Sequence, residues 1–365
     1  MSRETLIVQA KRTLYCNYAN ILSVRGVFLF AIHPYSDATY TPPSETPASS
    51  TTPTTPTIPN DNNVDIIFGD KAAEKVAAQK VEVKDNIKTT TITLDDAAVK
   101  ENLDKLDEAD QDAEKKIIIP VSNKSDVVIG VFSGQTVKDM EDKDVVLEIR
   151  TEDVSYTIPA AEINIDAVPA QLGTNVGLKD IKVSISVADS SKDTVKIVED
   201  SSKKNGYQIV INPVEFEITC SAGGQTAAVS KFNSYVERTV AIPDGIDPSQ
   251  ITTGVVVNKD GTFSHVPTTI VVINGKYYAK INSLTNSTYT VIRNPVTFKD
   301  VENHWAKSYV NEVDSRLIDS GINDENFAPD RAITRAEFAS IVVKALGLKG
   351  TNFPDKFSDI ENNNP

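Results

Sequence analysis

Arg335 is the residue of this sequence whose type and position point most clearly to binding chemistry. It lies in the stretch ITRAE (residues 333–337), where Thr334 suits the N-cap of a helix and Glu337 completes a capping box. Arg335 then takes the first helical position, where the helix dipole disfavours a cation by about 0.3 kcal/mol or more. An arginine beside free helix amides is a good receptor for a carboxylate or a phosphate. The alternative is a surface arginine paired with a nearby acid such as Asp330, and the sequence leaves both readings open.

A helix that begins at Arg335 is predicted to hold this guanidinium in place. Its apolar residues recur at the spacing of one helix face; they are Phe338, Ile341, Val342, Ala345 and Leu346. Lys344 falls in the last turn, where a cation is favourable. Gly347 suits the left-handed position after the helix, and Leu348 can close the hydrophobic contact of a Schellman motif.

A second helix is expected just upstream, so that the two helices form a small helical hairpin. Its apolar residues follow a four-residue step; they are Trp305, Tyr309, Val313 and Leu317. Gly321 ends this helix, and Phe327 in the return loop is expected to cap the core. Trp305 is expected in the core, and because an indole has an apolar body it can also stack on a sugar face.

The rest of the sequence offers no catalytic or cofactor-binding pattern. Cys16 and Cys220 are far apart and belong to no Cys/His cluster, which argues against a zinc site and a disulfide scaffold. The three histidines lie in unrelated contexts, and no nucleophile elbow, HExxH, phosphate-binding loop or dinucleotide-binding motif occurs. We therefore expect a non-enzymatic protein without catalytic residues, metal ions or cofactors.

The charge of the chain limits the partners that it can bind. The 365 residues carry a formal net charge of −14, so nucleic acid and anionic membrane surfaces would be repelled. Nothing in the sequence approaches 18 consecutive apolar residues, so no membrane insertion is expected.

The central part of the chain is predicted to be mainly β. Residues 64–212 show short β-branched runs with one helical interruption near 95–106, and residues 181–187 alternate as a half-buried strand does. Residues 213–294 form a second β-rich module with hairpins at Asp260-Gly261 and Asn274-Gly275, dipeptides that suit type I′ turns. The fold class predicted is antiparallel β-sandwich-like modules followed by a small α-helical repeat.

The N-terminal part shows no globular pattern. Residues 42–63 form a Pro/Thr/Ser tract, which is typical of an extended linker. Residues 1–41 cannot be interpreted from their pattern. The apolar run at residues 26–32 resembles a weak signal-peptide core without a clean cleavage site, and the favoured alternative is a remnant of an upstream domain.

The C-terminal residues together resemble an S-layer homology repeat. The resemblance covers residues 297–348 within a repeat predicted at 295–350, and it rests on Phe298, Asp300-Val301, His304-Trp305, Gly321, Phe327, Pro329 and Ile333–Glu337. Residues 351–365 resemble the truncated start of a second repeat through Phe357-Ser-Asp-Ile360. The β-rich middle resembles the spacer modules of large exported proteins of Gram-positive spore-formers.

The resemblance implies an extracellular protein anchored at the cell wall. Repeats of this family usually come in threes and bind anionic secondary cell-wall polysaccharide, often through pyruvyl ketal carboxylates, with peptidoglycan as the surrounding material. It assigns Arg335 to the ligand carboxylate and Trp305 to the lining of the groove. It assigns Asp300 to sugar hydroxyls or to ordering of the groove, and Gly321 to close approach of the ligand. Family grooves form between neighbouring repeats, and a repeat of about 50 residues is near the limit of independent stability.

Two other functions stay open at this point. The chain can be the wall-anchoring tail of an exported polysaccharide hydrolase whose catalytic domain is absent from it. A glycoside hydrolase needs two placed carboxylates in a cleft, and the acidic residues here are scattered over strands and helix surfaces. The chain can also be a self-associating lattice protein whose β modules make lateral contacts.

Overall fold

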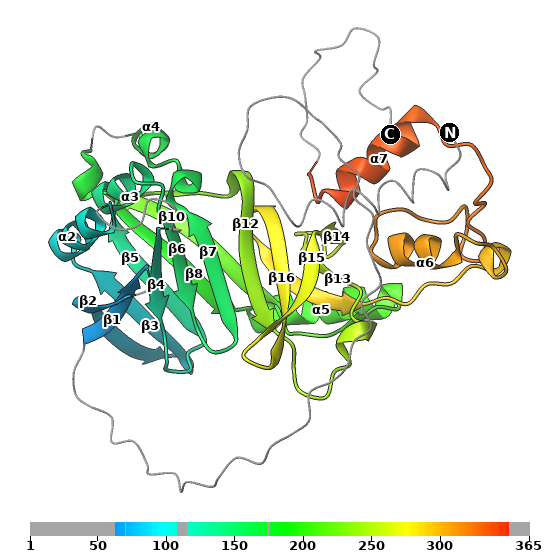
Figure 1. The fold of residues 1–365 in the computed structure, drawn as a ribbon, viewed down its shortest axis with the longest axis horizontal. Coiled ribbons are helices and arrows are strands. Elements are labelled where there is room, and N and C mark those ends of the chain that lie inside the picture. Colours follow the sequence, from blue (N-terminus) through cyan, green and yellow to red (C-terminus); the bar gives the residue numbers. More distant parts are fainter. Residues whose placement is uncertain (1–62, 70, 108–114, 174–175, 350–365) are drawn as a thin grey trace, which may run out of the picture. The chain divides into compact units, whose positions relative to one another are not determined.

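The computed structural model describes residues 63–69, 71–107, 115–173 and 176–349. The expectations for residues 1–41, for the linker up to residue 62 and for the second repeat at 351–365 lie outside these ranges. The described part is mainly β with predominantly antiparallel pairing, and its helices α6 (Lys307–Ser315) and α7 (Arg335–Ala345) follow the last strand (Figure 1). The predicted fold class is confirmed.

The first β module (residues 63–228) consists of two layers of strands. One layer runs through β3 (Ile87–Leu94), β5 (Val127–Ser133), β8 (Lys182–Asp189), β10 (Val214–Ala222) and β11 (Gln225–Ala228). The other runs through β1 (Asn63–Phe68), β4 (Lys116–Pro120), β6 (Val146–Arg150) and β7 (Val154–Pro159). Strand β2 (Lys71–Lys84) pairs with both β1 and β3 and so connects the layers.

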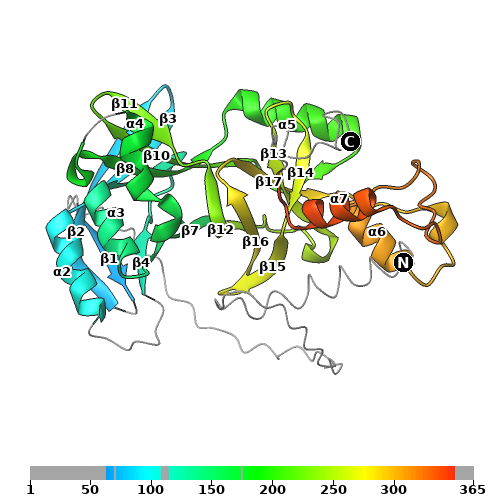
Figure 2. The same ribbon diagram turned by 90° about the horizontal axis from the view of Figure 1, so that it is seen from above.

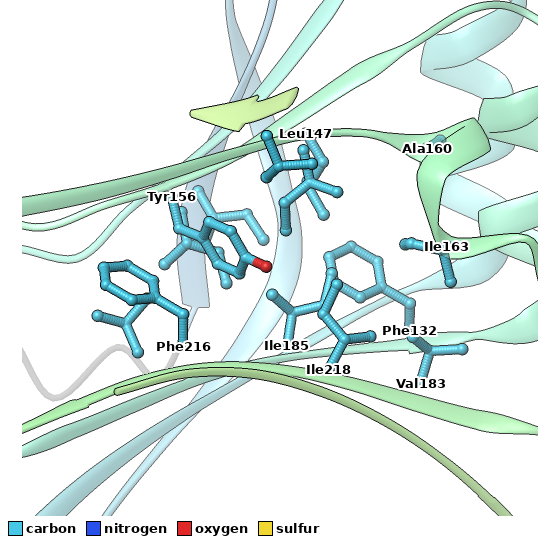
Figure 3. Close-up of a cluster of buried hydrophobic side chains, with 14 of the residues drawn as sticks. Phe132, Leu147, Tyr156, Ala160, Ile163, Val183, Ile185, Phe216 and Ile218 are labelled. Carbon is cyan, nitrogen blue, oxygen red and sulfur yellow. The ribbon is translucent and has the colours of Figure 1, made fainter. Parts of the chain in front are cut away.

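The core of this module lies between the two layers. Figure 3 shows Leu147 and Tyr156 of one layer opposite Phe132, Ile185 and Phe216 of the other, and all five are almost completely buried. The rings of Tyr156 and Phe216 meet edge to face with centroids 5.0 Å apart. The alternation predicted for residues 181–187 is present, because every second residue of β8 is buried. Apolar burial of this kind supplies about 25 cal/mol per Å² and holds the layers together.

Two pairs among the described strands are parallel, which the sequence did not suggest. They are β3–β5 and β4–β6. Parallel neighbours need a crossover connection, and helices α2 (Asp96–Asp107) and α3 (Gly134–Glu141) lie in these connections at one end of the strands (Figure 1). Helix α2 is the one that the sequence predicts.

Three further helices were not predicted. They are α3, α4 (Val168–Leu172) and α5 (Lys192–Asn205), with 3₁₀ turns at η1 (Ala160–Ile163), η2 (Ile165–Ala167), η3 (Leu178–Asp180) and η4 (Pro248–Gln250). Helix α5 is capped by Ser191 and ends at Gly206, but Val198 is its only fully buried apolar residue. A helix so polar lacks the apolar stripe that sequence reading depends on.

The second β module (residues 231–293) contains the two predicted hairpins. Its strands are β12 (Lys231–Ala241), β13 (Thr253–Val257), β14 (Phe263–Val266), β15 (Thr268–Ile273), β16 (Lys276–Thr285) and β17 (Thr288–Arg293), with β9 (Gln208–Ile209) added to β17. Asn274 and Gly275 have φ values of 50° and 80°, as a type I′ turn requires. At the other hairpin only Gly261 has a positive φ, so a longer loop replaces the predicted type I′ turn.

The strand pairing does not divide the chain at residue 213. Strand β10 follows Pro213 and pairs with β8 from Val214 to Ser221, so it continues the first module. Strand β12 lies between β7 and β16 and pairs with both (Figure 2). The two β modules therefore share a strand, and the boundary predicted at 212/213 is not a break in the sheet.

Arg238 lies on this shared strand and is completely buried. Its guanidinium donates to the carbonyl oxygens of Val236 and Thr285, each at 2.8 Å. Its carbon atom Cζ lies 4.9 Å from the ring centroid of Tyr156 and 4.7 Å from that of Tyr289. Because these groups come from β7, β12, β16 and β17, the cation connects strands of both modules.

Candidate functional site

The C-terminal repeat has a small core built mostly from residues of the predicted hairpin. Phe298 and Phe327 pack with ring centroids 5.5 Å apart, and Val310, Val313 and Ile341 are also buried. The predicted four-residue stripe of the first helix is wrong except at Val313. Helix α6 begins only at Lys307 and buries Val310 and Val313, which are three residues apart.

Asp300 orders the return loop of the repeat. Both oxygens of its carboxylate accept from the Phe327 amide, at 3.0 and 3.1 Å, and one also accepts from the Ala328 amide at 2.7 Å. Ala328 has a φ of 60°, a left-handed conformation that is uncommon for alanine. The carboxylate thus stabilises an unfavourable turn, and of the two roles expected for Asp300 its contacts are those of an ordering residue.

Gly321 lies in a turn that has no space for a side chain. An added Cβ would come within 2.5 Å of the Phe298 ring and 2.6 Å of the Asn323 carbonyl oxygen. The Gly321 amide also donates to the Asp314 carboxylate at 3.1 Å. The glycine therefore allows close packing of the repeat on itself, which differs from the close ligand approach that the resemblance assigns to it.

The start of α7 contains the expected capping box. The Thr334 hydroxyl accepts from the Glu337 amide at 3.1 Å, and the Glu337 carboxylate accepts from the Thr334 amide at 2.8 Å. Arg331, which sequence reasoning missed, donates to the other oxygen of Glu337 at 2.5 Å. This guanidinium is the main reason that the pKa of Glu337 falls to about 2. A cation three residues before the N-cap is the sequence signal that could have shown this pair.

Arg335 is exposed at the first position of α7. Within residues 63–349 as described, its guanidinium has no hydrogen-bond or ion-pair partner. Asp330 does not pair with it, and instead lies 3.8 Å from Nε2 of His304. The capping box uses the amides of Thr334 and Glu337, so the amides of Arg335 and Ala336 point out of the first turn as free donors. A cation and two amide donors thus lie together at the positive end of a helix.

Trp305 is exposed rather than part of the core. Its side chain is 61% accessible, and its ring lies 5.7 Å from that of His304. The Ala306 amide donates to Nδ1 of His304 at 3.2 Å. Since Nε2 of His304 lies 3.8 Å from the Asp330 carboxylate, the indole lies on the segment next to the loop that leads into α7. An exposed indole of this kind is available for stacking on a sugar.

Helix α7 leaves much of its apolar face uncovered. Of the five residues predicted on this face only Ile341 and Ala345 are buried, whereas Phe338 is 43% and Leu346 37% exposed. The predicted spacing is present, but among the described residues α7 contacts β14 of the second β module, and only one edge of the stripe is buried. A further element of structure against this face would be needed to complete it.

These residues belong to a recognised kind of domain. Residues 297–339 match the family model of the S-layer homology domain. The chain therefore carries an S-layer homology domain, which is a non-catalytic module of cell-wall anchoring.

Three relatives illustrate the proteins to which the chain is similar. The amylopullulanase of Thermoanaerobacterium thermosulfurigenes is 26% identical over 239 residues, which are 60% of this chain and 12% of that protein. The cellulosome-anchoring protein of Acetivibrio thermocellus is 38% identical over 72 residues, 18% of this chain and 16% of that protein. The S-layer protein EA1 of Bacillus anthracis is 42% identical over 53 residues, 14% of this chain and 6% of that protein. The chain thus spans less than a fifth of each relative.

Two structural findings concern membranes and metals. Among the described helices, none combines the length and the apolar character that a bilayer crossing demands. In the same residues, no three histidine, cysteine or acidic side chains gather as a metal site. The domain and the relatives indicate a location at the cell surface or in the cell wall.

Proposed function

We propose that the chain is a non-catalytic protein that anchors at the cell wall by binding an anionic secondary polysaccharide through its S-layer homology repeat. The observation that carries this proposal is the exposed Arg335 without a partner among the described residues, beside two free amides at the start of α7. A pyruvyl ketal carboxylate would accept from this fork of donors.

The electrostatics of the helix start favour such a ligand. The N-terminal end of a helix stabilises an anion by about 0.3–1 kcal/mol, and a charge-assisted hydrogen bond adds about 1.5–3 kcal/mol. The bound carboxylate would also remove the unfavourable interaction between Arg335 and the helix dipole. Trp305 would add an apolar surface for one sugar ring, because it lies on the neighbouring segment and is 61% exposed.

Asp300 and Gly321 have supporting roles in this proposal. The oxygens of Asp300 already accept from two amides through three contacts, so the carboxylate shapes the loop between the two helices. Gly321 permits the tight turn against Phe298. Neither residue needs to touch the polysaccharide for the site to form.

The polymer dependence of anchoring can be tested with isolated cell walls. The purified chain should co-sediment with native walls and should fail to do so with walls from which the secondary polysaccharide has been extracted. Adding the extracted polysaccharide back as a soluble competitor should release the chain from native walls. Equal retention on native and extracted walls would contradict the proposal.

A second candidate function is anchoring of an exported polysaccharide hydrolase. The similarity to an amylopullulanase covers 60% of this chain, which includes more than the S-layer homology domain. In this case the same wall binding would retain an enzyme, and the catalytic domain would be encoded beside this segment. Reading the neighbouring coding sequence discriminates between the two, whereas turnover of a polysaccharide by this chain alone would contradict its non-catalytic role.

A further inference from the structure

Strand β15 lies at an open edge of the second β module. It follows β12 and β16 in one row of strands (Figure 2), and it pairs with β16 along its whole length. Among the described residues no other strand pairs with it. One side of its backbone is therefore left without the hydrogen bonds of a sheet. We call this side of β15 the open edge.

The pairing shows which backbone groups face the open edge. Val272 lies opposite Tyr277, whose carbonyl oxygen accepts from the Ile242 amide at 2.9 Å on the β12 side of the sheet. The polar groups of Tyr277 thus point away from β15, which makes this a non-hydrogen-bonded pair. Because the two kinds of pair alternate along an antiparallel ladder, Ile270 and Val272 direct their N–H and C=O groups to the open edge. Val271 directs its own groups to β16.

Other edge strands of the described structure carry features that prevent pairing. Helix α7 lies against β14, and helix α4 lies against β11. The end of β2 beyond its pairing with β1 alternates Lys80, Glu82 and Lys84, and the first two form an ion pair of 2.8 Å. Covering helices and charged side chains are usual ways in which proteins avoid edge-to-edge association.

The residues of β15 lack this protection. Its sequence TTIVVI contains no charge and no proline, and its last four residues, Ile270–Ile273, are all apolar. Val272 is 59% and Ile273 43% exposed, and Tyr277 beside Val272 is 46% exposed. An uncharged strand of β-branched residues with an exposed end is a template for a further strand.

The charges next to β15 are already paired within the chain. On β16, Lys276 forms an ion pair with Asp153 and Lys280 forms one with Glu237, each at 2.8 Å. The surroundings of the open edge therefore carry little net charge. In a chain with a formal net charge of −14, two copies repel each other over most of their surface, and a neutral edge is where they approach at the least electrostatic cost.

We propose that β15 pairs with β15 of a second copy of this chain, antiparallel and about a two-fold axis. The second strand presents the same outward N–H and C=O groups, so each satisfies the other, as in any isologous interface. With the axis at Val271, Ile270 of each copy lies opposite Val272 of the other, and the two pairs form about four hydrogen bonds. Stable interfaces bury about 1,200–2,000 Å², more than two six-residue strands supply, so the pairing is reversible and depends on concentration.

Pairing through β15 would bring two S-layer homology repeats into one assembly. If each repeat binds the wall as proposed above, the second contact becomes intramolecular and retention rises without any new contact to the wall. The pairing itself does not depend on Arg335. Its test uses no wall material, so its failure would leave the wall-binding proposal untouched.

Sedimentation equilibrium of the whole chain over a concentration series tests the pairing. The wild type should show a reversible equilibrium between monomer and dimer. Val272→Lys places two lysines about 7–8 Å apart as diagonal neighbours across the axis, and it should weaken the dimer at least 10-fold. Val272→Glu should do the same, whereas an equimolar mixture of these two variants should dimerise again. Val83→Lys changes a 69% exposed apolar residue at the end of β2, and it should dimerise like the wild type.

Amide hydrogen exchange resolved by NMR tests the backbone geometry. The amides of Ile270 and Val272 should exchange more slowly at high than at low protein concentration, and the Val271 amide should not change. A chain that stays monomeric, or a dimer that Val272→Lys leaves intact, would overturn the proposal. Slow exchange of Ile270 and Val272 at every concentration would also overturn it, because a strand of the same chain would then occupy the open edge. Weaker association in Val83→Lys would place the contact elsewhere.

Discussion

Arg238 and Arg335 place the same guanidinium group in opposite surroundings. Arg238 is completely buried between the two β modules, where carbonyl oxygens and aromatic faces surround it. Arg335 is exposed on α7 and has no partner in the described part of the repeat. The hydrogen bonds and ring contacts of Arg238 lie inside the fold, so we expect its loss to affect stability. The donors of Arg335 remain available, so we expect its loss to affect binding.

The largest effect is expected when the buried cation is removed. Arg238→Ala should lower the free energy of unfolding by about 3–5 kcal/mol, since it leaves a cavity of aromatic side-chain size between the modules. It also removes cation–π contacts, which contribute about 2 kcal/mol or more when they are desolvated. Urea unfolding followed by far-ultraviolet circular dichroism measures the change.

The half-buried Arg293 serves as the control for this substitution. It donates to Gln208 at 3.2 Å near the edge of the second module, so Arg293→Ala should change the free energy of unfolding by less than about 1 kcal/mol. If the Arg238→Ala protein were as stable as the Arg293→Ala protein, Arg238 would not hold the modules together.

A smaller effect is expected at Asp300, which acts inside the repeat that presents Arg335. Asp300→Ala should destabilise the return loop by about 2 kcal/mol, because hydrogen bonds to a charged group contribute about 1.5–3 kcal/mol. Hydrogen exchange measured by mass spectrometry should show faster exchange of the Phe327 and Ala328 amides, which donate to this carboxylate. Exposed Asp324 is the matched acid, and Asp324→Ala should leave this exchange unchanged. Slow exchange in Asp300→Ala would show that other contacts hold the loop.

The smallest effect concerns the pH dependence of the cap that precedes Arg335. Arg331 lowers the pKa of Glu337 to about 2, below its ordinary value of 4.5. The ionised cap therefore stabilises the repeat above pH 4.5, and this contribution is lost as the pH falls from 4.5 through 2. The melting temperature of the wild type should exceed that of Glu337→Gln at pH 7, and the difference should shrink towards pH 2. A difference that stays constant with pH would exclude this role of the carboxylate.

Local signals in the sequence were sufficient for part of the fold. The capping box at Thr334 and the turn at Asn274-Gly275 depend on a few neighbouring residues, and the alternation of β8 depends on one strand. Each could be predicted because its physical cause lies within a short segment.

The surroundings of Arg238 could not be predicted in this way. Its segment reads YVERTVA, and the charged pair Glu237-Arg238 suggests a solvated strand face. The burial of Arg238 arises because β12 pairs with β7 on one side and β16 on the other, and the residues of β7 lie about 80 positions earlier in the chain. The parallel pairs β3–β5 and β4–β6 depend on equally distant partners.

The candidate site was also predicted only in part. Arg335 was identified because it breaks a local rule at the start of a helix, and the structure places it exposed there. Trp305 was expected in the core on helical spacing, yet α6 starts two residues later and leaves the indole 61% exposed. Arg331 was missed because its partner Glu337 already had a role in the cap.

Retention of Arg335→Ala on native cell walls tests the central claim most directly. Loss of one charge-assisted contact, about 1.5–3 kcal/mol, should weaken co-sedimentation roughly 10- to 100-fold while circular dichroism stays unchanged. Arg335→Lys should bind with intermediate strength, because a lysine keeps the charge but lacks the paired donors. Lys299→Ala, which removes an exposed cation of the same repeat that pairs with Glu325, should be retained like the wild type. Equal retention of Arg335→Ala and the wild type would contradict the account.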